Sequence, residues 1–289
     1  MRLILTLPTA ACALALTSSG IALSSDLAGV AAPGATETNF TYSGALTQGG
    51  WVRGQAPQGA LFVKLGGRTL EVDESGRFFA AFDRDADSRQ ILQAELASGA
   101  LAETALSIRP RAWNIEHVNI ARRTGGASEA FMARRRPELA AIGAARSKET
   151  GAQGWRQDFV WPVKGRISGR FGSQRVYRGE PGSYHSGMDI TTGKSGSPFV
   201  APADGVVVLA ASTPFSLEGN LLIVDHGQGL NSAFLHASKL LVKEGDEVKR
   251  GQHIGNIGMT GRATGPHLHW SIKWRDARLD PLLFVSSAE

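Results

Sequence analysis

Four side chains in the C-terminal third of the sequence could together bind a metal ion and transfer protons: His185, Asp189, His267 and His269. Catalytic zinc usually takes three histidine or carboxylate ligands from the protein and keeps a fourth position for water. His185 and Asp189 are four residues apart, so they share one face of a helix or of a strand. His267 and His269 alternate within an apolar run, which places them on one strand face at a spacing of roughly 7 Å. The pattern predicts a zinc site in which one histidine of this pair binds the metal and the other points into the same cavity.

The distribution of histidines supports a site, although any single histidine is more often structural. Six of the seven histidines lie between His185 and His269. The helical H-E-x-x-H type of zinc site is excluded, because no glutamate follows either histidine of the pair and Gly187 weakens a helix. His226 follows a charged residue at the end of an apolar run, and we expect it to be hydrogen-bonded to a turn. His117 stands alone, and no role is assigned to it or to His253.

The segment from about residue 161 to residue 281 resembles the lysostaphin/LytM-type zinc endopeptidases of peptidoglycan. The resemblance rests on H-x-x-x-D followed about eighty residues later by H-x-H, together with further motifs in the order typical of the family. These motifs are G-R-F-G at 169–172, H-S-G-M-D-I at 185–190, A-P-A-D-G at 201–205, D-H-G at 225–227, G-M-T-G at 258–261 and T-G-P-H-L-H at 264–269. The family more often has Tyr and Leu where this chain has Phe234 and Ala237, a departure that leaves the chemistry untouched.

The resemblance implies a division of labour among five side chains. His185, Asp189 and His269 would be the zinc ligands, and His236 and His267 the two catalytic histidines that do not bind metal. Zinc in such a site can lower the pKa of a water to about 7 and polarise the scissile carbonyl. Histidine, with an ordinary pKa near 6.5, can act as acid or base at neutral pH. We expect His267 to be the general base and His236 to hydrogen-bond the oxyanion or the substrate, and the two roles could be exchanged.

The substrate that the resemblance implies is the peptide part of peptidoglycan, cut at a cross-link such as the bond from D-Ala to meso-diaminopimelate. Thr260 and Thr264, on a glycine-containing loop, are expected to line a narrow groove for the stem peptides. The alternative function is that of a non-catalytic member of the same fold, which activates a separate cell-wall amidase. Such members typically lack one or more zinc ligands, whereas every ligand position is filled here.

Two other function classes fit the sequence poorly. A serine hydrolase would need a G-x-S-x-G nucleophile elbow, and the sequence contains none. The sequence patterns of segments 202–206 and 242–252 also recur in biotinyl and lipoyl carrier domains. A carrier would need an exposed turn lysine of the Met-Lys-Met or Asp-Lys kind, which the sequence lacks, and it would give no reason for the H-x-H pair.

The elements that must position these residues are mainly β. Short alternating runs between residues 37 and 112 predict a small immunoglobulin-like sandwich of six or seven strands, for example Leu61 to Leu65 before a glycine turn. A linker helix is expected within 127–150, opening near the arginine run 134–136 with a proline in its first turn. Residues 155–289 are predicted to form a LytM-type antiparallel β domain, with buried strands at 206–209 and 221–224.

Composition and the N-terminus bear on the compartment. Residues 1–22 resemble a cleaved signal peptide, with a basic start and an apolar core, which predicts export to the periplasm or cell envelope. The single cysteine, Cys12, lies in this segment, so no disulfide framework or thiolate nucleophile is expected. Without Arg2 the chain keeps 30 basic and 26 acidic residues, a net charge of +4 that would assist approach to an anionic wall polymer but also occurs in many proteins without such a partner. The expected partners are peptidoglycan stem peptides and a divisome or amidase protein, with neither nucleic acid nor stable membrane insertion after signal cleavage.

Overall fold

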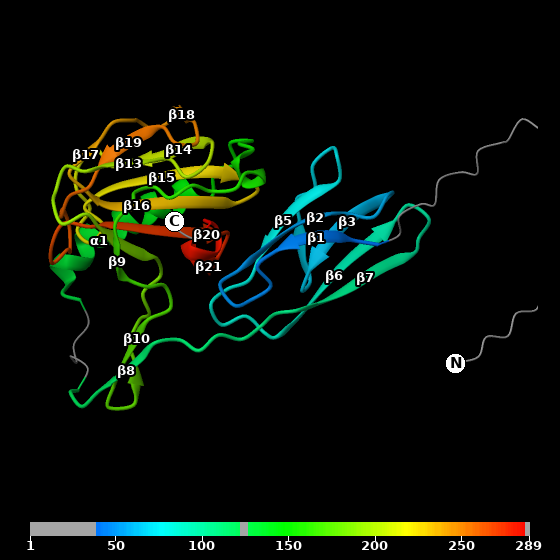
Figure 1. Ribbon diagram of the computed structural model, residues 1–289, viewed down its shortest axis with the longest axis horizontal. Helices are drawn as coiled ribbons and strands as arrows, with labels where there is room; N and C mark the ends of the chain where they lie inside the picture. The colour runs from blue at the N-terminus through cyan, green and yellow to red at the C-terminus, as the bar shows by residue number, and fades with distance from the viewer. Residues whose placement is uncertain (1–38, 122–126, 287–289) are drawn as a thin grey trace, which may run out of the picture. The chain divides into compact units, whose positions relative to one another are not determined.

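The computed structural model describes residues 39–121 and 127–286. The predicted signal peptide at 1–22, with Cys12, lies outside these ranges. The described chain is mainly β and carries one α-helix, as the sequence predicts (Figure 1). No helix in these ranges is both long and apolar enough to cross a membrane.

The N-terminal strands form two antiparallel sheets, in the orders β1-β2-β5 and β4-β3-β6-β7. Their seven strands match the number expected. Val63, Phe78 and Leu92 are fully buried, whereas Leu61 is 65% exposed and departs from the predicted alternation. The immunoglobulin-like character of these sheets stays a prediction. The strands are β1 (Thr41–Gly44), β2 (Trp51–Gln55), β3 (Ala60–Leu65), β4 (Arg68–Leu70), β5 (Arg77–Ala81), β6 (Arg89–Leu96) and β7 (Leu101–Ser107).

The chain that leaves these sheets contributes a strand to the C-terminal region. β8 (Ile115–Val118) pairs in parallel with β10 (Gln174–Tyr177), whose other neighbour is β11 (Glu180–Pro181). Because β10 lies between the G-R-F-G motif and His185, the N-terminal segment lies beside the part of the chain that leads into the site.

Helix α1 (Glu129–Arg146) starts earlier than the arginine run suggests. The Ser128 hydroxyl caps it by accepting a hydrogen bond from the backbone N–H of Phe131 at 3.2 Å, and Glu129 places negative charge in the first turn. Pro137 therefore lies inside the helix, and the prediction that it belongs to the first turn is wrong. The helix buries Ala145 against four apolar side chains of the main sheet, Val208, Leu221, Ile223 and Ala233.

The C-terminal region is built on an eight-stranded sheet in the order β18-β14-β15-β16-β20-β12-β9, with β21 paired to β20. Every neighbouring pair is antiparallel, as predicted for this domain. The predicted buried runs fall in β14 and β15. The strands are β9 (Arg166–Gly169), β12 (Met188–Thr191), β14 (Gly205–Ala210), β15 (Asn220–Gly227), β16 (Leu230–Ala237), β18 (Glu247–Val248), β20 (Leu268–Trp274) and β21 (Ala277–Leu279).

Smaller elements complete this region. β13 (Pro198–Val200), β19 (His253–Asn256) and β17 (Lys239–Leu240) form a three-stranded antiparallel sheet. Two single-turn 3₁₀ helices, η1 (Gly154–Arg156) and η2 (Pro281–Leu283), flank the domain.

Candidate metal and catalytic site

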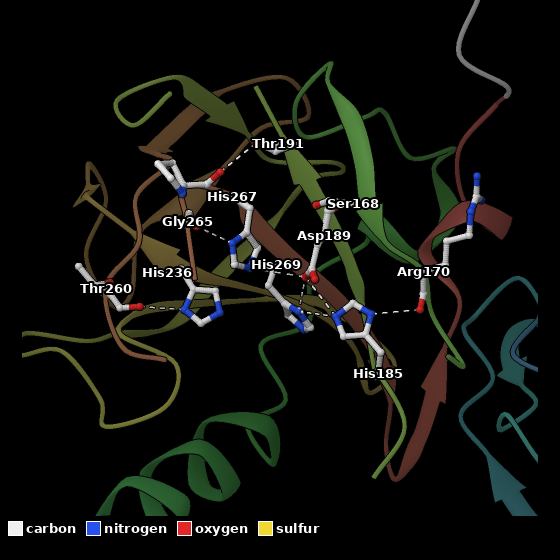
Figure 2. A network of polar contacts seen from close by, with 11 residues as sticks. Ser168, Arg170, His185, Asp189, Thr191, His236, Thr260, Gly265, His267 and His269 are labelled. Carbon is white, nitrogen blue, oxygen red and sulfur yellow. Dashed lines mark hydrogen bonds and ion pairs between the residues drawn. The ribbon is translucent and has the colours of Figure 1, made fainter. Parts of the chain in front are cut away.

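The register of two strands brings together residues that are eighty positions apart in the sequence. Asp189 on β12 lies directly opposite His269 on β20. His185 precedes the first residue of β12 by three positions, and His267 precedes the first residue of β20 by one. The expectation that these segments form one site is met by this pairing (Figure 2).

Three polar atoms converge at the centre of the site. His185 Nε2 lies 3.1 Å from Asp189 Oδ1 and 3.1 Å from His269 Nδ1, and His269 Nδ1 lies 2.8 Å from Asp189 Oδ1. Two ligands at 2.0–2.1 Å from a tetrahedral zinc ion would be about 3.3 Å apart. His185, Asp189 and His269 are the described residues whose side chains cluster in a way that could hold a metal ion.

The hydrogen bonds around this cluster show that its chemistry fits a cation. His185 Nδ1 lies 3.1 Å from the backbone carbonyl of Arg170, which can only accept, so Nδ1 carries the proton and Nε2 presents a lone pair. That lone pair faces a carboxylate oxygen and the Nδ1 atom of His269. Acceptors placed this close repel each other unless a proton or a metal ion lies between them. A backbone carbonyl that orients a histidine from its far side is also the usual support of a metal ligand.

Burial and pairing shift the pKa values of the three groups. Burial acts to raise the pKa of Asp189, but its close contacts with His185 and His269 outweigh burial and hold that pKa well below its usual range. Burial lowers the pKa of His269, which keeps the ring neutral. Burial also acts to lower the pKa of His185, and there the contact with Asp189 prevails and raises it. An ionised carboxylate and a neutral imidazole are the forms that bind zinc.

The two remaining histidines of the site are held by backbone carbonyls. His267 Nδ1 donates to Gly265 O at 2.9 Å, and His236 Nδ1 donates to Thr260 O at 2.8 Å (Figure 2). In the neutral tautomer that this bond favours, each ring offers Nε2 as an acceptor. The ring centroids lie 4.9 Å apart, and His267 Nε2 is 3.7 Å from Asp189 Oδ1. Burial lowers the pKa of His236, so its ring is neutral at pH 7.

The backbone of His236 is in the left-handed region, with φ of 65°. Such a conformation is uncommon for a residue with a side chain and persists only where the surroundings enforce it. Here the backbone N–H of His236 donates to Glu218 O at 2.8 Å. The ring and the main chain of His236 are thus fixed by two different loops.

One glycine of the motif is required by close packing at the cluster. A Cβ atom added to Gly187 would lie 2.6 Å from His269 Nε2 and 2.7 Å from the backbone oxygen of Trp270. No side chain fits there without displacing His269. Gly187 is thus needed for the approach of the two ligand segments, a role that helix propensity does not reveal.

A cavity of about 400 Å³ opens over the cluster. Thr264 lines it, and substrate binding by Thr264 stays a prediction. Thr260 does not: its hydroxyl donates to Ala237 O and accepts from Asn220 N, at 3.0 and 2.9 Å. The Thr260 hydroxyl is thus engaged within the protein, and substrate binding by Thr260 also stays a prediction. The lining residues are Tyr184, His185, Ser186, Asp189, Leu217, Glu218, Leu235, His236, Arg262, Ala263, Thr264, His267 and His269.

The turn that supplies Leu217 and Glu218 was not anticipated from the sequence. Residues 212–219 carry no motif of ligand spacing, and only their position before an apolar strand could have drawn attention to them. Of the other histidines, His226 is fully buried and bonded on both ring nitrogens, to Asp204 O at 2.8 Å and to the Ser232 hydroxyl at 2.9 Å. This confirms the structural interpretation of His226. His253 is exposed and lies away from the cavity.

Comparison with known proteins agrees with this geometry. Residues 183–281 match the model of peptidase family M23. This region is an M23 domain. The predicted resemblance to the lysostaphin/LytM type is confirmed, and the matched residues include the five candidate site residues His185, Asp189, His236, His267 and His269.

Of two curated relatives of the M23 domain, one is named as an endopeptidase and the other as an activator of hydrolases. Over 118 residues the chain is 42% identical to the peptidoglycan DD-endopeptidase ShyA of Vibrio cholerae. The alignment covers 39% of this chain and 26% of ShyA. Over 131 residues the chain is 35% identical to the murein hydrolase activator NlpD of Escherichia coli. That alignment covers 45% of this chain and 31% of NlpD. The chain therefore spans less than a third of either relative.

A solved structure resembles more of the chain than its M23 domain. A Pseudomonas aeruginosa protein described as a candidate M23 peptidase has a TM-score of 0.61 and 28% identity, and the match covers 83% of this chain and 94% of that one. The described fold, the N-terminal sheets included, is therefore shared with a second protein.

Proposed function

We propose that this protein is a zinc-dependent endopeptidase that cuts peptide cross-links of peptidoglycan. The observation that carries the proposal is the convergence of His185 Nε2, Asp189 Oδ1 and His269 Nδ1 within 3.1 Å of one another, beneath a cavity that also holds two further histidines. The similarity to an M23 DD-endopeptidase supports the bond from D-Ala to meso-diaminopimelate as the substrate.

In this proposal His185, Asp189 and His269 hold the zinc ion. Bound zinc supplies Lewis acidity, which activates water and polarises a peptide carbonyl. The backbone carbonyl of Arg170 keeps His185 in the tautomer that offers Nε2. Asp189, ionised throughout the physiological range, provides the negative charge that a dication requires.

His267 is proposed as the general base. Its Nδ1–H is fixed on Gly265, so its free Nε2 can take a proton beside the ligands. His236 faces the same cavity from β16. In its neutral form it accepts a hydrogen bond at Nε2, and once protonated it can donate one to a developing oxyanion.

The proposed location is the periplasm or cell envelope, which rests on the predicted signal at residues 1–22. Peptidoglycan stem peptides are the proposed ligand, and a divisome protein or amidase is a proposed partner. The competing function is activation of a cell-wall amidase without catalysis, which the similarity to the murein hydrolase activator NlpD favours. The complete ligand set favours the enzyme.

The deciding experiment incubates cross-linked muropeptides with zinc-loaded protein and follows the products by mass spectrometry. The wild type should convert dimers to monomers. His267→Ala should retain zinc and lose about 10²–10⁴-fold in rate, since it removes proton transfer and not a ligand. His253→Ala is the matched control, because His253 is exposed and does not line the cavity.

Two outcomes would redirect the assignment. If the zinc-loaded wild type leaves dimers intact and yet stimulates an amidase, the activator function holds. If it cuts only glycine bridges, the zinc endopeptidase stands and the choice of cross-link fails.

A further inference from the structure

Helix α1 lies outside the residues that match the M23 family, yet it holds the turn beside the catalytic cavity through buried charge. Arg135 is only 8% exposed. Its guanidinium forms a two-point ion pair with Glu218, with Nη1–Oε2 of 2.6 Å and Nη2–Oε1 of 2.7 Å. Paired geometry of this kind is among the strongest and most directional contacts between side chains.

A second residue of α1 holds the same turn. Glu138 Oε1 accepts from the backbone N–H of Ser216 at 2.7 Å, and Glu138 Oε2 accepts from the Ser216 hydroxyl at 2.5 Å. Glu138 also accepts from Arg135 at 3.0 Å, so the contacts form one network. The turn is closed on itself by two backbone hydrogen bonds between Phe215 and Gly219.

The turn 215–219 supports His236 at two points. The carbonyl of Glu218 accepts from the His236 backbone N–H, which secures the left-handed conformation of that residue. The Thr260 hydroxyl accepts from the N–H of Asn220, and the Thr260 carbonyl orients the His236 ring (Figure 2). A Cβ atom at Gly219 would lie 2.2 Å from the Thr260 hydroxyl, so the turn and the Thr260 loop are in direct contact.

We infer that Arg135 and Glu138 of α1 are positioning residues for His236. Arg135 and Glu138 act on His236 through the turn 215–219, and neither of the two lines the cavity. A catalytic group that is displaced by about 1 Å can lose about 100-fold in rate. The left-handed backbone conformation of His236 costs energy and persists only while its surroundings enforce it. Loss of the support from the turn therefore allows the backbone of His236 to relax. The inference rests on the proposed function for its effect on rate, and on geometry alone for its effect on the His236 ring.

The test compares Arg135→Gln with Arg136→Gln in the zinc-loaded protein. Arg136 is the matched control, because it forms its ion pair with Glu129 on the exposed side of the same helix, where the two side chains are 60% and 77% exposed. The readouts are kcat, KM, zinc content, Tm and the ring signals of His236 in a long-range ¹H–¹⁵N correlation spectrum at one fixed pH.

Arg135→Gln should lower kcat about tenfold or more, keep the zinc content and shift the His236 ring signals. Arg135→Lys, which restores charge without the two-point geometry, should fall between Gln and wild type. Arg136→Gln should match the wild type in every readout. Glu138→Gln, which keeps an acceptor for the Ser216 N–H, should move the same readouts by less, and it is the variant to use if Arg135→Gln does not fold.

A purely stabilising pair would give a different pattern. If Arg135→Gln lowers Tm while kcat and the His236 signals stay at their wild-type values, the inference is wrong. If the His236 signals move as expected but no form of the protein cleaves muropeptides, the positioning stands and the proposed function fails.

Discussion

At the scale of single residues, His267 and His269 have different surroundings although they lie two positions apart. His267 is bound through Nδ1 to a carbonyl two residues away, so only its Nε2 remains free. His269 instead directs Nδ1 at Asp189 and His185. The hydrogen-bond partner of each ring, and not its residue type, separates the proposed ligand from the proposed base.

The ligand set leads to a prediction about metal content. Asp189→Ala removes the one carboxylate of the cluster. Loss of a residue that only supports a metal ligand lowers metal affinity by up to about 100-fold, so loss of this ligand should lower zinc affinity by more than that. Metal analysis after dialysis against a weak chelator measures this. Asp87→Ala, an exposed aspartate away from the cavity, should keep its zinc. Undiminished zinc in Asp189→Ala would remove Asp189 from the ligand set.

At the scale of elements, strand β15 shows how a motif histidine becomes structural. His226 donates from Nδ1 to Asp204 O and accepts at Nε2 from Ser232, so a neutral ring is fully satisfied. Burial lowers the pKa of His226 to about 4. Protonation would break the bond from Ser232 and place a charge inside the sheet.

This burial predicts a pH dependence of stability. Between pH 6.5, the pKa of an unfolded histidine, and about 4, the unfolded chain binds the proton and the folded chain does not. Stability is therefore present above pH 6.5 and is lost as the pH falls toward 4, by up to about 3 kcal/mol. Urea unfolding at pH 7 and pH 5 should show a larger loss for wild type than for His226→Gln. An equal loss in both proteins would contradict the assignment.

At the scale of the whole molecule, the N-terminal sheets and the M23 domain belong to one compact unit with a continuous core. Trp51 donates from Nε1 to Leu283 O at 2.8 Å, and its ring lies 5.4 Å from Phe284. Phe79 contacts Phe284 and Trp274 at ring distances of 6.5 and 6.3 Å. The N-terminal part thus contributes to the stability of the peptidase part.

Phe79→Ala tests this shared core. Phe79 is 1% exposed, and its truncation should lower the free energy of unfolding by about 3–5 kcal/mol. Because the core is continuous, signals from both parts should shift together in denaturant unfolding. Leu61→Ala, at a side chain that is 65% exposed, should stay within about 0.5 kcal/mol of wild type. A shift confined to the N-terminal sheets would show that the two parts unfold independently.

The amino-acid sequence by itself determined the mainly β class, a count of six or seven strands for the N-terminal sheets, and the candidate site residues that the structure brings together. Residue type and local spacing are sufficient for these features: alternation sets which strand face a side chain occupies, and His185, Asp189 and His269 have the chemistry of ligands. The sequence also separated His226 from the site, because a histidine at the end of an apolar run has turn groups to bond.

The tertiary structure decided what depends on contacts between distant segments. Strand register set Asp189 opposite His269, and backbone carbonyls selected the ring nitrogen that each histidine offers. The Thr260 hydroxyl accepts a hydrogen bond from Asn220, forty residues away, a contact that no local pattern predicts. The start of α1 was set by a serine cap, and the link from Arg135 through Glu218 to His236 joins three segments that no local pattern connects.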